Sequence, residues 1–274
     1  MTRSLEVAVL QYCAGPDQTS TLPIVCRLIS EAANRGASLI CLPECANFLA
    51  ANKASLRKLA EDETSSQSLS CLQDLAKSYQ IHISVGSLMM RAEADDRQAN
   101  RSYLIGPEGT ILARYNKIHM FDADVGDGKR YRESENFKPG DMLVHHKTKI
   151  GHIGLSICYD IRFPHLYRQL GQAGAEMITI PAAFTRVTGA AHWHVLQRAR
   201  AIETGSFILA AAQCGEHADG RKTYGHSLII NPWGEILADA GDSAEGFIQA
   251  KINLAQVKQA RAALRHLLHE PEYS

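Results

Sequence analysis

Three residues directly follow stretches that predict apolar strands, the place where reactive side chains of α/β proteins are commonly found. Cys158 ends the predicted strand over 149–157, Glu44 follows the predicted strand over 38–42, and Lys117 follows the one over 111–113. A thiol can attack an electrophilic carbon, a carboxylate can accept a proton, and an ammonium can stabilise developing negative charge. Brought together, these three residue types would support nucleophilic catalysis.

Each of the three also has an ordinary structural explanation. Free cysteine is among the most buried residue types, so Cys158 taken alone is more often a core residue than a nucleophile. A glutamate or a lysine after a strand, such as Glu44 or Lys117, is commonly a solvated loop residue. The prediction of a site therefore depends on the combination, and on the elements that position it.

Strands and helices alternate along the chain. The predicted helices lie over 19–35 and 67–79, through Leu166 and Leu170, and over 190–204 and 253–268. The predicted strands lie over 6–11, 38–42, 81–85, 103–105, 111–113, 142–146, 149–157, 177–180, 207–212, 227–231, 235–238 and 247–252. About twelve strands are more than one open sheet holds comfortably. We therefore expect an α/β fold with two sheets packed face to face between helix layers, in one domain over residues 1–274.

Residues 116–141 interrupt this periodicity with charged residues, glycines and a proline. A segment of this length without regular structure inside a compact domain is usually functional. We expect it to be irregular and to contribute to a site.

Composition excludes several classes of protein. The 29 Lys and Arg residues balance 29 Asp and Glu residues, which removes the basic surface expected of nonspecific nucleic-acid binding. No apolar run approaches the ~20 residues that span a bilayer, and the first residues lack the features of a signal peptide. The seven cysteines are an odd number, so at least one is outside any intramolecular disulfide. We expect a reducing, cytoplasmic location without membrane insertion.

The segments around the three residues resemble, in the right order, the signature blocks of the nitrilase, or carbon–nitrogen hydrolase, superfamily. They are Leu42-Pro43-Glu44, Asn116-Lys117-Ile118-His119 and Ile157-Cys158-Tyr159-Asp160-Ile161-Arg162-Phe163-Pro164, followed by similar later motifs at 181–185, 191–203 and 231–234. The resemblance covers essentially the whole chain. It implies a four-layer αββα sandwich, assembly into dimers or higher homo-oligomers, and hydrolysis of non-peptide C–N bonds by a Glu–Lys–Cys triad.

Amide hydrolysis gives each member of the implied triad a role. Cys158 would attack the carbonyl carbon and form a thioester. Glu44 would accept the thiol proton, protonate the departing ammonia and then activate water. Lys117 and the backbone N–H of Tyr159 would stabilise the oxyanion, and the charge of Lys117 would favour the thiolate.

The resemblance also implies a second carboxylate, because Tyr131-Arg132-Glu133-Ser134 is similar to another block of the family. Glu133 would orient Lys117 or the attacking water. Glu135 is close enough in sequence to be the alternative.

Within the superfamily the chain looks most like the amidase branch that acts on ω-amides of 2-oxo acids, deaminated glutathione among them. The segments 116–125, 158–164, 210–215 and 224–227 carry this likeness. His194 departs from the glutamate that relatives often have at its position, without affecting the triad. The alternatives are a nitrilase or an N-carbamoyl amino acid hydrolase with the same triad, and a non-enzymatic interaction protein, against which the intact triad argues.

A carboxylate-bearing substrate would need arginine or backbone donors, because bidentate pairing fixes a planar anion. The candidate substrate contacts are Tyr159, Arg162, Phe184 and Thr185, and Arg186 also follows a strand end. Helix capping or an interface ion pair is an equally ordinary role for the two arginines.

The remaining expectations concern partners. His192-Trp193-His194 and His145-His146 lack the spacing of a helical zinc pair, and burial explains Cys41 and Cys45 better than metal binding. We expect no metal and no cofactor, a small-molecule amide and water as partners, and no nucleic acid. The apolar stripe of the last helix predicts that the tail from about residue 253 packs on the domain or at a subunit interface.

Overall fold

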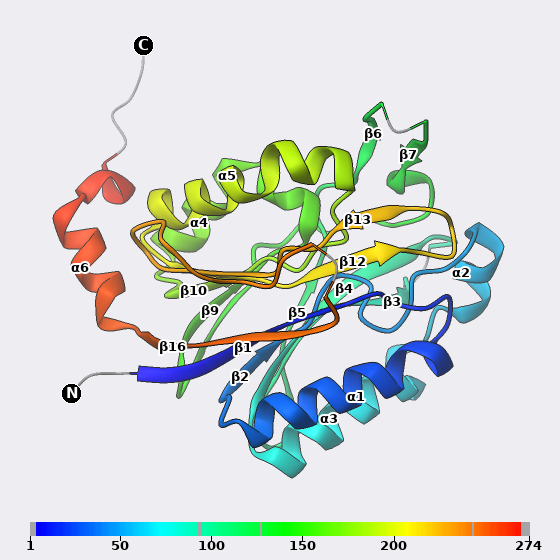
Figure 1. Cartoon of the computed structure of the whole chain (residues 1–274), viewed down its shortest axis with the longest axis horizontal. Coiled ribbons are helices and arrows are strands. Elements are labelled where there is room, and N and C mark those ends of the chain that lie inside the picture. Colours follow the sequence, from blue (N-terminus) through cyan, green and yellow to red (C-terminus); the bar gives the residue numbers. More distant parts are fainter. Residues whose placement is uncertain (1–3, 93–94, 127, 243, 270–274) are drawn as a thin grey trace.

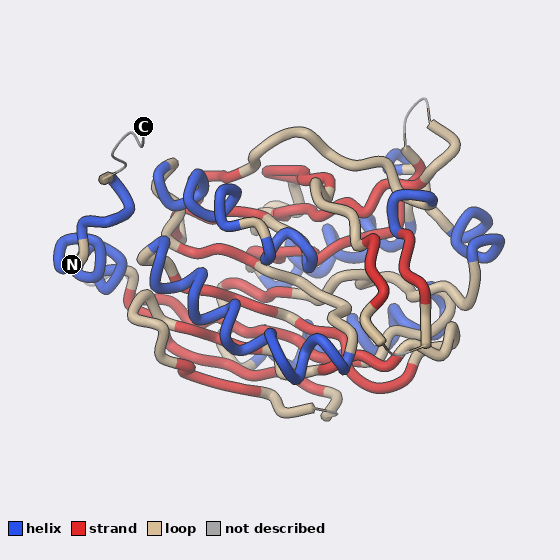
Figure 2. The backbone as a smooth tube through the Cα atoms, turned by 90° about the horizontal axis from the view of Figure 1, so that it is seen from above, coloured by secondary structure: helices blue, strands red, loops and turns tan. Residues whose placement is uncertain are grey.

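The computed structural model describes residues 4–92, 95–126, 128–242 and 244–269. Two β-sheets pack face to face, with helices on both outer sides (Figures 1 and 2). The expected αββα sandwich is confirmed. The ends 1–3 and 270–274, which belong to the predicted domain and tail, lie outside the described residues.

The first sheet carries two of the predicted site residues at the ends of its strands. Its order is β13 (Lys222–Tyr224), β12 (Ala212–Glu216), β1 (Ser4–Tyr12), β2 (Leu39–Cys41), β3 (His82–Arg91), β4 (Gln98–Ile105) and β5 (Ile111–Asn116), with β16 (Gly246–Asn253) also paired to β1. β2 and β3 are parallel, and β5 runs in the same direction because two antiparallel pairings separate it from β3. Glu44 and Lys117 therefore follow the carboxyl ends of strands that point the same way.

The second sheet carries the third predicted site residue, Cys158. Its order is β15 (Ile236–Asp239), β14 (Leu228–Ile230), β11 (Phe207–Ala210), β10 (Met177–Thr179), β9 (Gly151–Leu155) and β8 (His145–Thr148). β9, β10 and β11 are parallel, and Cys158 follows β9. The helices α4 (Pro164–Gln172) and α5 (Arg186–Thr204) lie over this sheet, whereas α1 (Gln18–Asn34) and α3 (Gln67–Tyr79) lie over the first (Figure 1).

The core is divided by the alternation of side chains along each strand. On β1, Val7 and Val9 belong to the core shared with the second sheet, whereas Ala8 and Leu10 belong to the core beneath α1 and α3. All four are fully buried. Successive side chains of a strand point to opposite faces, so a strand covered on both faces is continuously apolar. This explains the uninterrupted apolar runs of the sequence.

Helices α1 and α3 bring two cysteines into contact on the outer side of the first sheet. The sulfur atoms of Cys26 and Cys71 are 3.2 Å apart, and both residues are free and partly exposed.

The single strand predicted over 207–212 is wrong. The chain leaves the second sheet after β11 and enters the first sheet with β12, and only Ala211 lies between the two strands. Residues 207–210 and 212–214 are all buried, so no change in hydrophobicity marks the crossing.

The segment 116–141 is more ordered than expected. It contains an antiparallel hairpin of β6 (Asp122–Asp124) and β7 (Arg130–Arg132), followed by a 3-10 turn over Glu133–Glu135. Four of the six strand residues are charged, and each strand has only three residues, which is too short for an apolar alternation to be recognised in the sequence. Figure 1 shows this hairpin rising beside β13.

Two further helical segments differ from the expectation. The short helix α2 (Lys53–Leu59) was not predicted. The last helix, α6, covers only Ala255–Ala263, because Leu264 adopts an extended conformation and a 3-10 turn follows over Arg265–Leu268. Among the helices within the described ranges, none is both long and apolar enough to cross a membrane.

Candidate active site

Glu44 is positioned by a close approach between β3 and the segment that follows β2. A Cβ atom on Gly86 of β3 would lie 2.0 Å from the carbonyl oxygen of Leu42 and 2.1 Å from that of Pro43, so only glycine fits. Gln213 of β12 donates a hydrogen bond of 2.9 Å to the carbonyl oxygen of Glu44. The backbone before and after the Glu44 side chain is thus fixed from two neighbouring strands.

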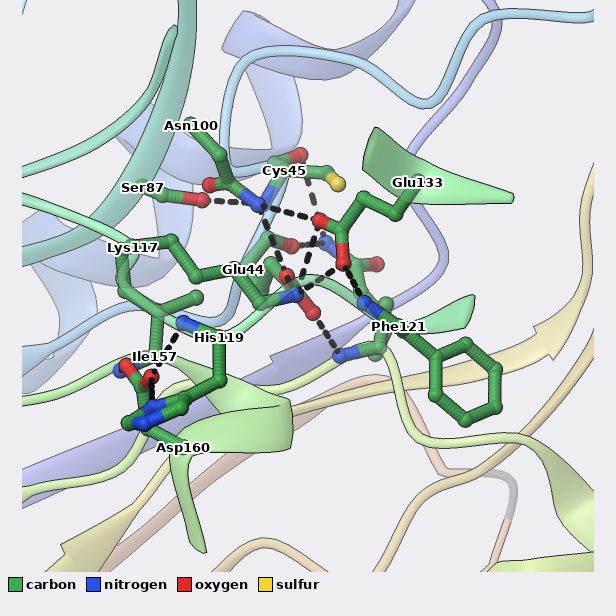
Figure 3. A network of polar contacts seen from close by, with 12 residues as sticks. Glu44, Cys45, Ser87, Asn100, Lys117, His119, Phe121, Glu133, Ile157 and Asp160 are labelled. Atoms are coloured by element: carbon green, nitrogen blue, oxygen red, sulfur yellow. Dashed lines mark hydrogen bonds and ion pairs between the residues drawn. The ribbon is translucent and has the colours of Figure 1, made fainter. Parts of the chain in front are cut away.

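Four polar side chains form one hydrogen-bonded cluster around the Lys117 ammonium (Figure 3). Lys117 Nζ lies 2.9 Å from Glu44 Oε1 and 2.8 Å from each carboxylate oxygen of Glu133. Asn100 Nδ2 donates to the same two carboxylates, at 2.9 Å and 3.3 Å. The structure therefore places Glu133 rather than Glu135, whose side chain is exposed, beside Lys117.

The two carboxylates are further held by backbone donors. The N–H of Ala183, which follows β10, donates to Glu44 Oε2 at 2.8 Å. The N–H of Phe121 donates to Glu133 Oε2 at 2.6 Å. Each carboxylate thus accepts hydrogen bonds from Lys117, Asn100 and one backbone amide, which fixes its orientation.

Cys158 begins a 3-10 turn over Cys158–Arg162 and has a φ of 47°, the left-handed region that non-glycine residues rarely adopt. Its N–H donates to the carbonyl oxygen of Pro181 at 2.8 Å, which holds this conformation. The thiol and the Glu44 carboxylate line the same cavity, and the charge of Glu44 acts on the thiol.

Asp160 ties the turn of the nucleophile to the strand that carries Lys117. Its carboxylate accepts hydrogen bonds from the N–H of Ile157 at 2.8 Å, the hydroxyl of Tyr115 at 2.7 Å and the N–H of His119 at 3.0 Å. Because Tyr115 and His119 flank Lys117, this fully buried carboxylate sets the position of Cys158 relative to Lys117.

The protonation states follow from burial and charge. Burial would raise the pKa of Glu44, but Lys117 and the hydrogen bonds to the carboxylate lower it overall. Burial would lower the pKa of Lys117, but Glu133 and Glu44 raise it well above its usual value. At neutral pH Glu44 is thus an ionised base and Lys117 a permanent cation.

The thiol of Cys158 differs from the expectation that Lys117 would favour a thiolate. Burial and the charge of Glu44 raise the pKa of Cys158 well above its usual value, and the opposing effect of Lys117 is smaller. The resting nucleophile is a neutral thiol. Attack by this thiol would therefore need a base close by, and the ionised Glu44 carboxylate lines the same cavity.

A cavity of about 240 Å³ opens beside these groups. Glu44, Lys117, Glu133 and Cys158 line it at one end. The rest of the wall includes apolar residues, charged residues of β7 and charged residues of the loop between β12 and β13: Phe48, Leu56, Met89, Phe121, Tyr131, Phe137, Arg130, Arg132, Asp219 and Arg221.

The predicted substrate contacts lie elsewhere on the turn after Cys158 and at the start of α5. The Arg162 guanidinium packs 5.8 Å from the ring centre of Tyr159 and 5.2 Å from that of Phe184. Thr185 is buried and its hydroxyl bonds the hydroxyl of Thr188. None of the four residues lines the 240 Å³ cavity, so their contact with substrate stays a prediction.

Sequence reasoning missed Asn100, Asp160 and Arg221. Asn100 lies before the predicted strand over 103–105, in a stretch with no local signal, whereas the structure places it in β4. Asp160 belongs to the same motif as Cys158, and its position two residues after the nucleophile was the available signal.

His194 was also assigned no partner, although it lies 3.0 Å from the Asp239 carboxylate, which His226 Nδ1 contacts at 3.0 Å. These three side chains are of types that bind metals and their ligand atoms converge. They lie outside the active-site cavity, and one ring nitrogen of each histidine already contacts the Asp239 carboxylate.

Comparison with known proteins gives a consistent family. The carbon–nitrogen hydrolase family model matches residues 6–262. The chain is 40% identical to a Yersinia enterocolitica protein named deaminated glutathione amidase, over 97% of this chain and 93% of that protein. A human protein of the same name is 39% identical, over 95% of this chain and 80% of that protein. The crystal structure of the C. elegans NitFhit protein is similar with a TM-score of 0.91 and 34% identity, over 97% of this chain and 65% of that longer chain.

Proposed function

Because the chain belongs to the carbon–nitrogen hydrolase family, we propose that it hydrolyses a small carboxylate-bearing amide, deaminated glutathione or a related ω-amide of a 2-oxo acid. The chain is a hydrolase of non-peptide C–N bonds. The observation that carries the mechanism is the placement of the Cys158 thiol and an ionised Glu44 on one cavity, with Glu44 2.9 Å from the Lys117 ammonium.

The first step forms the acyl-enzyme. Glu44 takes the proton of Cys158 as the sulfur attacks the amide carbon, and the carbonyl oxygen becomes an oxyanion. Because the thiol has a raised pKa and Glu44 a lowered one, proton transfer is unfavourable before attack and is coupled to it. Lys117 stays protonated and stabilises the oxyanion, together with the backbone N–H of Tyr159.

The tetrahedral intermediate then collapses. Glu44 gives its proton to the leaving nitrogen, the C–N bond breaks, and the acyl group remains on Cys158 as a thioester. Glu44, ionised again, takes a proton from water, whose oxygen attacks the thioester carbon. The acid leaves, and the proton returns from Glu44 to the Cys158 sulfur. One water is consumed, and the enzyme regains its starting state.

Glu133 has a positioning role in this mechanism. Both of its oxygens accept from Lys117 at 2.8 Å, so it draws the ammonium away from a simple pair with Glu44 and holds it between the two carboxylates. Glu44 is then free to exchange protons while Lys117 keeps its place.

The leaving group depends on the substrate. A primary ω-amide releases ammonia. Glutathione is a γ-glutamyl amide of cysteinylglycine, so hydrolysis of the γ-amide of its deaminated form releases cysteinylglycine and 2-oxoglutarate. The ammonia expected from the sequence therefore applies to primary amides only.

We also keep Tyr159, Arg162, Phe184 and Thr185 as proposed substrate contacts. The support is positional: Tyr159 and Arg162 belong to the turn that begins at Cys158. The Arg162 guanidinium is held by the aromatic rings beside it and by His192 Nδ1 at 3.3 Å. Its position is therefore fixed, and in the sequence it follows shortly after Cys158.

The test is a product assay on matched substrates. Wild-type protein should convert deaminated glutathione to cysteinylglycine and 2-oxoglutaramate to ammonia, and should leave nitriles and N-carbamoyl amino acids unchanged. Preferred hydrolysis of either of the last two classes would contradict the proposed substrate. Mass spectrometry should detect an acyl adduct on wild-type protein and none on Cys158→Ala.

We propose that the chain forms a homodimer or a higher homo-oligomer through the outer face of α5. Val187, Val195 and Ile202 of α5 are 50%, 69% and 41% exposed. Ile202, Trp233 and Leu264 line one shallow hollow of about 210 Å³, so the exposed apolar surface continues from α5 to the tail. Covering it with a second copy would remove it from water.

Two further proposals concern organisation and location. One domain over the whole chain is supported by β1, which pairs with β2 and also with β12 and β16 from the second half of the sequence. A cytoplasmic location is supported by the requirement for a reduced Cys158 and by the free state of the other cysteines.

A further inference from the structure

Arg221 lines the active-site cavity, and no residue that the structure describes accepts a hydrogen bond from its guanidinium. It ends the loop between β12 and β13. Its side chain is 28% exposed, and its Nε atom is shielded from solvent without a partner. The guanidinium has one ion pair, 3.4 Å from Nη2 to Asp219 Oδ2, which is longer than the usual 2.7–2.9 Å of a charge-assisted hydrogen bond.

Arg132, which also lines the cavity, has a guanidinium whose terminal nitrogens are paired. Arg132 places its two terminal nitrogens 3.3 Å and 2.9 Å from the two oxygens of Asp124. Arginine has five N–H donors in a planar fork, and polar groups shielded from water are normally paired. Arg221 therefore retains donor capacity at the cavity that Arg132 does not.

The catalytic carboxylates do not need Arg221. Glu44 and Glu133 already accept hydrogen bonds from Lys117, Asn100 and backbone amides. The positive charge of Arg221 is thus available to something that enters the cavity.

The loop holds Arg221 in a fixed place. Its own N–H donates to Asp219 Oδ1 at 2.8 Å, and Lys129 of the β6–β7 hairpin donates to the carbonyl oxygen of Asp219 at 2.6 Å. The ring of Tyr131 lies 5.5 Å from the guanidinium carbon. A donor fork held in advance loses little conformational entropy when an anion binds.

We propose that Arg221 binds a carboxylate of the substrate and so selects carboxylate-bearing amides. This inference rests on the proposed function and names the group that recognises the anionic end. Deaminated glutathione offers two carboxylates, one on the 2-oxo acid and one on the glycine, whereas 2-oxoglutaramate offers only the first.

The experiment compares kcat and KM of wild type and Arg221→Gln on deaminated glutathione, on its glycine amide, and on 2-oxoglutaramate. A charge-assisted hydrogen bond corresponds to a loss of roughly 10- to 100-fold. We expect KM to rise by that factor with kcat changed less. A rise for all three substrates assigns the 2-oxo acid carboxylate, and a rise for deaminated glutathione alone assigns the glycine carboxylate. Arg221→Lys should recover part of the loss, because it keeps the charge without the fork.

Lys222→Gln is the matched control. It removes one positive charge from the next residue, whose side chain is 57% exposed and pairs with Glu216 outside the cavity. Its KM should stay near that of wild type. An unchanged KM in Arg221→Gln, or an equal rise in Lys222→Gln, would overturn the proposal.

A readout that needs no turnover separates this proposal from the proposed function. If wild type cleaves none of the three substrates, the proposed function fails. Binding of a carboxylate at Arg221 is then tested with glutarate instead of a substrate. Glutarate should still slow the modification of Cys158 by methyl methanethiosulfonate in wild type and in Lys222→Gln, and not in Arg221→Gln. Equal protection of all three proteins would overturn the role of Arg221.

Discussion

Replacing Glu133 by glutamine separates the positioning of Lys117 from the reactivity of Cys158. The carboxylate accepts only: two contacts from Lys117 at 2.8 Å, one from the N–H of Phe121 at 2.6 Å and one from Asn100 at 3.3 Å. A glutamine NH₂ would face a donor in either orientation. Lys117 would lose one of its two counter-charges and move toward Glu44.

The expected loss of turnover has two bounds. Losing one hydrogen bond to a charged group corresponds to about 1.5–3 kcal/mol. Losing an oxyanion donor completely corresponds to about 2.7–4 kcal/mol. The value of kcat on 2-oxoglutaramate, followed by ammonia release, should therefore fall by a factor between about ten and about a thousand.

Cys158 should change in the opposite direction. The negative charge of Glu133 is one of the effects that raise the pKa of Cys158, so Glu133→Gln should lower that pKa. Methyl methanethiosulfonate, which is small and neutral, should then modify Cys158 faster than in wild type at the same pH. Glu135→Gln, the same change on an exposed residue of the same turn, should alter neither quantity.

Two results would refute this reasoning. A kcat of Glu133→Gln within threefold of wild type would show that Lys117 does not need this carboxylate. A parallel fall in turnover and in thiol modification would show that the substitution damages the whole site, and that Glu133 has no separate positioning role.

Three other predictions are independent of Glu133. Burial and the Glu44 charge raise the pKa of Cys158, so the rate of its modification by methyl methanethiosulfonate should still increase with pH above about 8.5, the usual thiol pKa. A rate that becomes constant below that pH would contradict a neutral resting thiol. Cys26 and Cys71, whose sulfur atoms are 3.2 Å apart, should form a disulfide with each other when glutathione disulfide is the oxidant. The intact mass of the protein should then fall by two hydrogens. The same loss in Cys26→Ser would exclude this pair. Val195→Glu should convert the oligomer to the 30.1 kDa monomer, as measured by light scattering, and the thermal stability of each protomer should be retained. An unchanged mass would exclude the α5 face as the interface.

The layers of the fold and the position of the triad could be predicted because they follow from local patterns. Glu44, Lys117 and Cys158 each follow a recognisable strand, and the carboxyl ends of strands that run the same way meet at one edge. The helix over Gln67–Tyr79 has the bounds that its apolar spacing predicts. The strands and helices require information from neighbouring residues only, whereas the grouping of the three residues into one site came from the combined resemblance of their segments to one superfamily.

The remaining features depend on long-range contacts. The chain changes sheets at Ala211 without any change in apolar character, because both neighbouring strands are buried. Asn100 and Asp160 acquire their roles from partners far away in the sequence. The hairpin that contains Arg130 has two strands of three residues each, held by their pairing, by one ion pair and by the buried ring of Tyr131. Strands this short show no periodicity in the sequence.

The left-handed backbone of Cys158 has a consequence for how the protein tolerates mutation. A non-glycine residue in this conformation costs about 1–2 kcal/mol, which the hydrogen bond to Pro181 and the surrounding packing offset. Selection for stability alone would favour glycine at this position, and selection for turnover opposes it. At the proposed nucleophile, stability and activity thus conflict, and a screen for thermal stability that ignores turnover should yield inactive variants at this position.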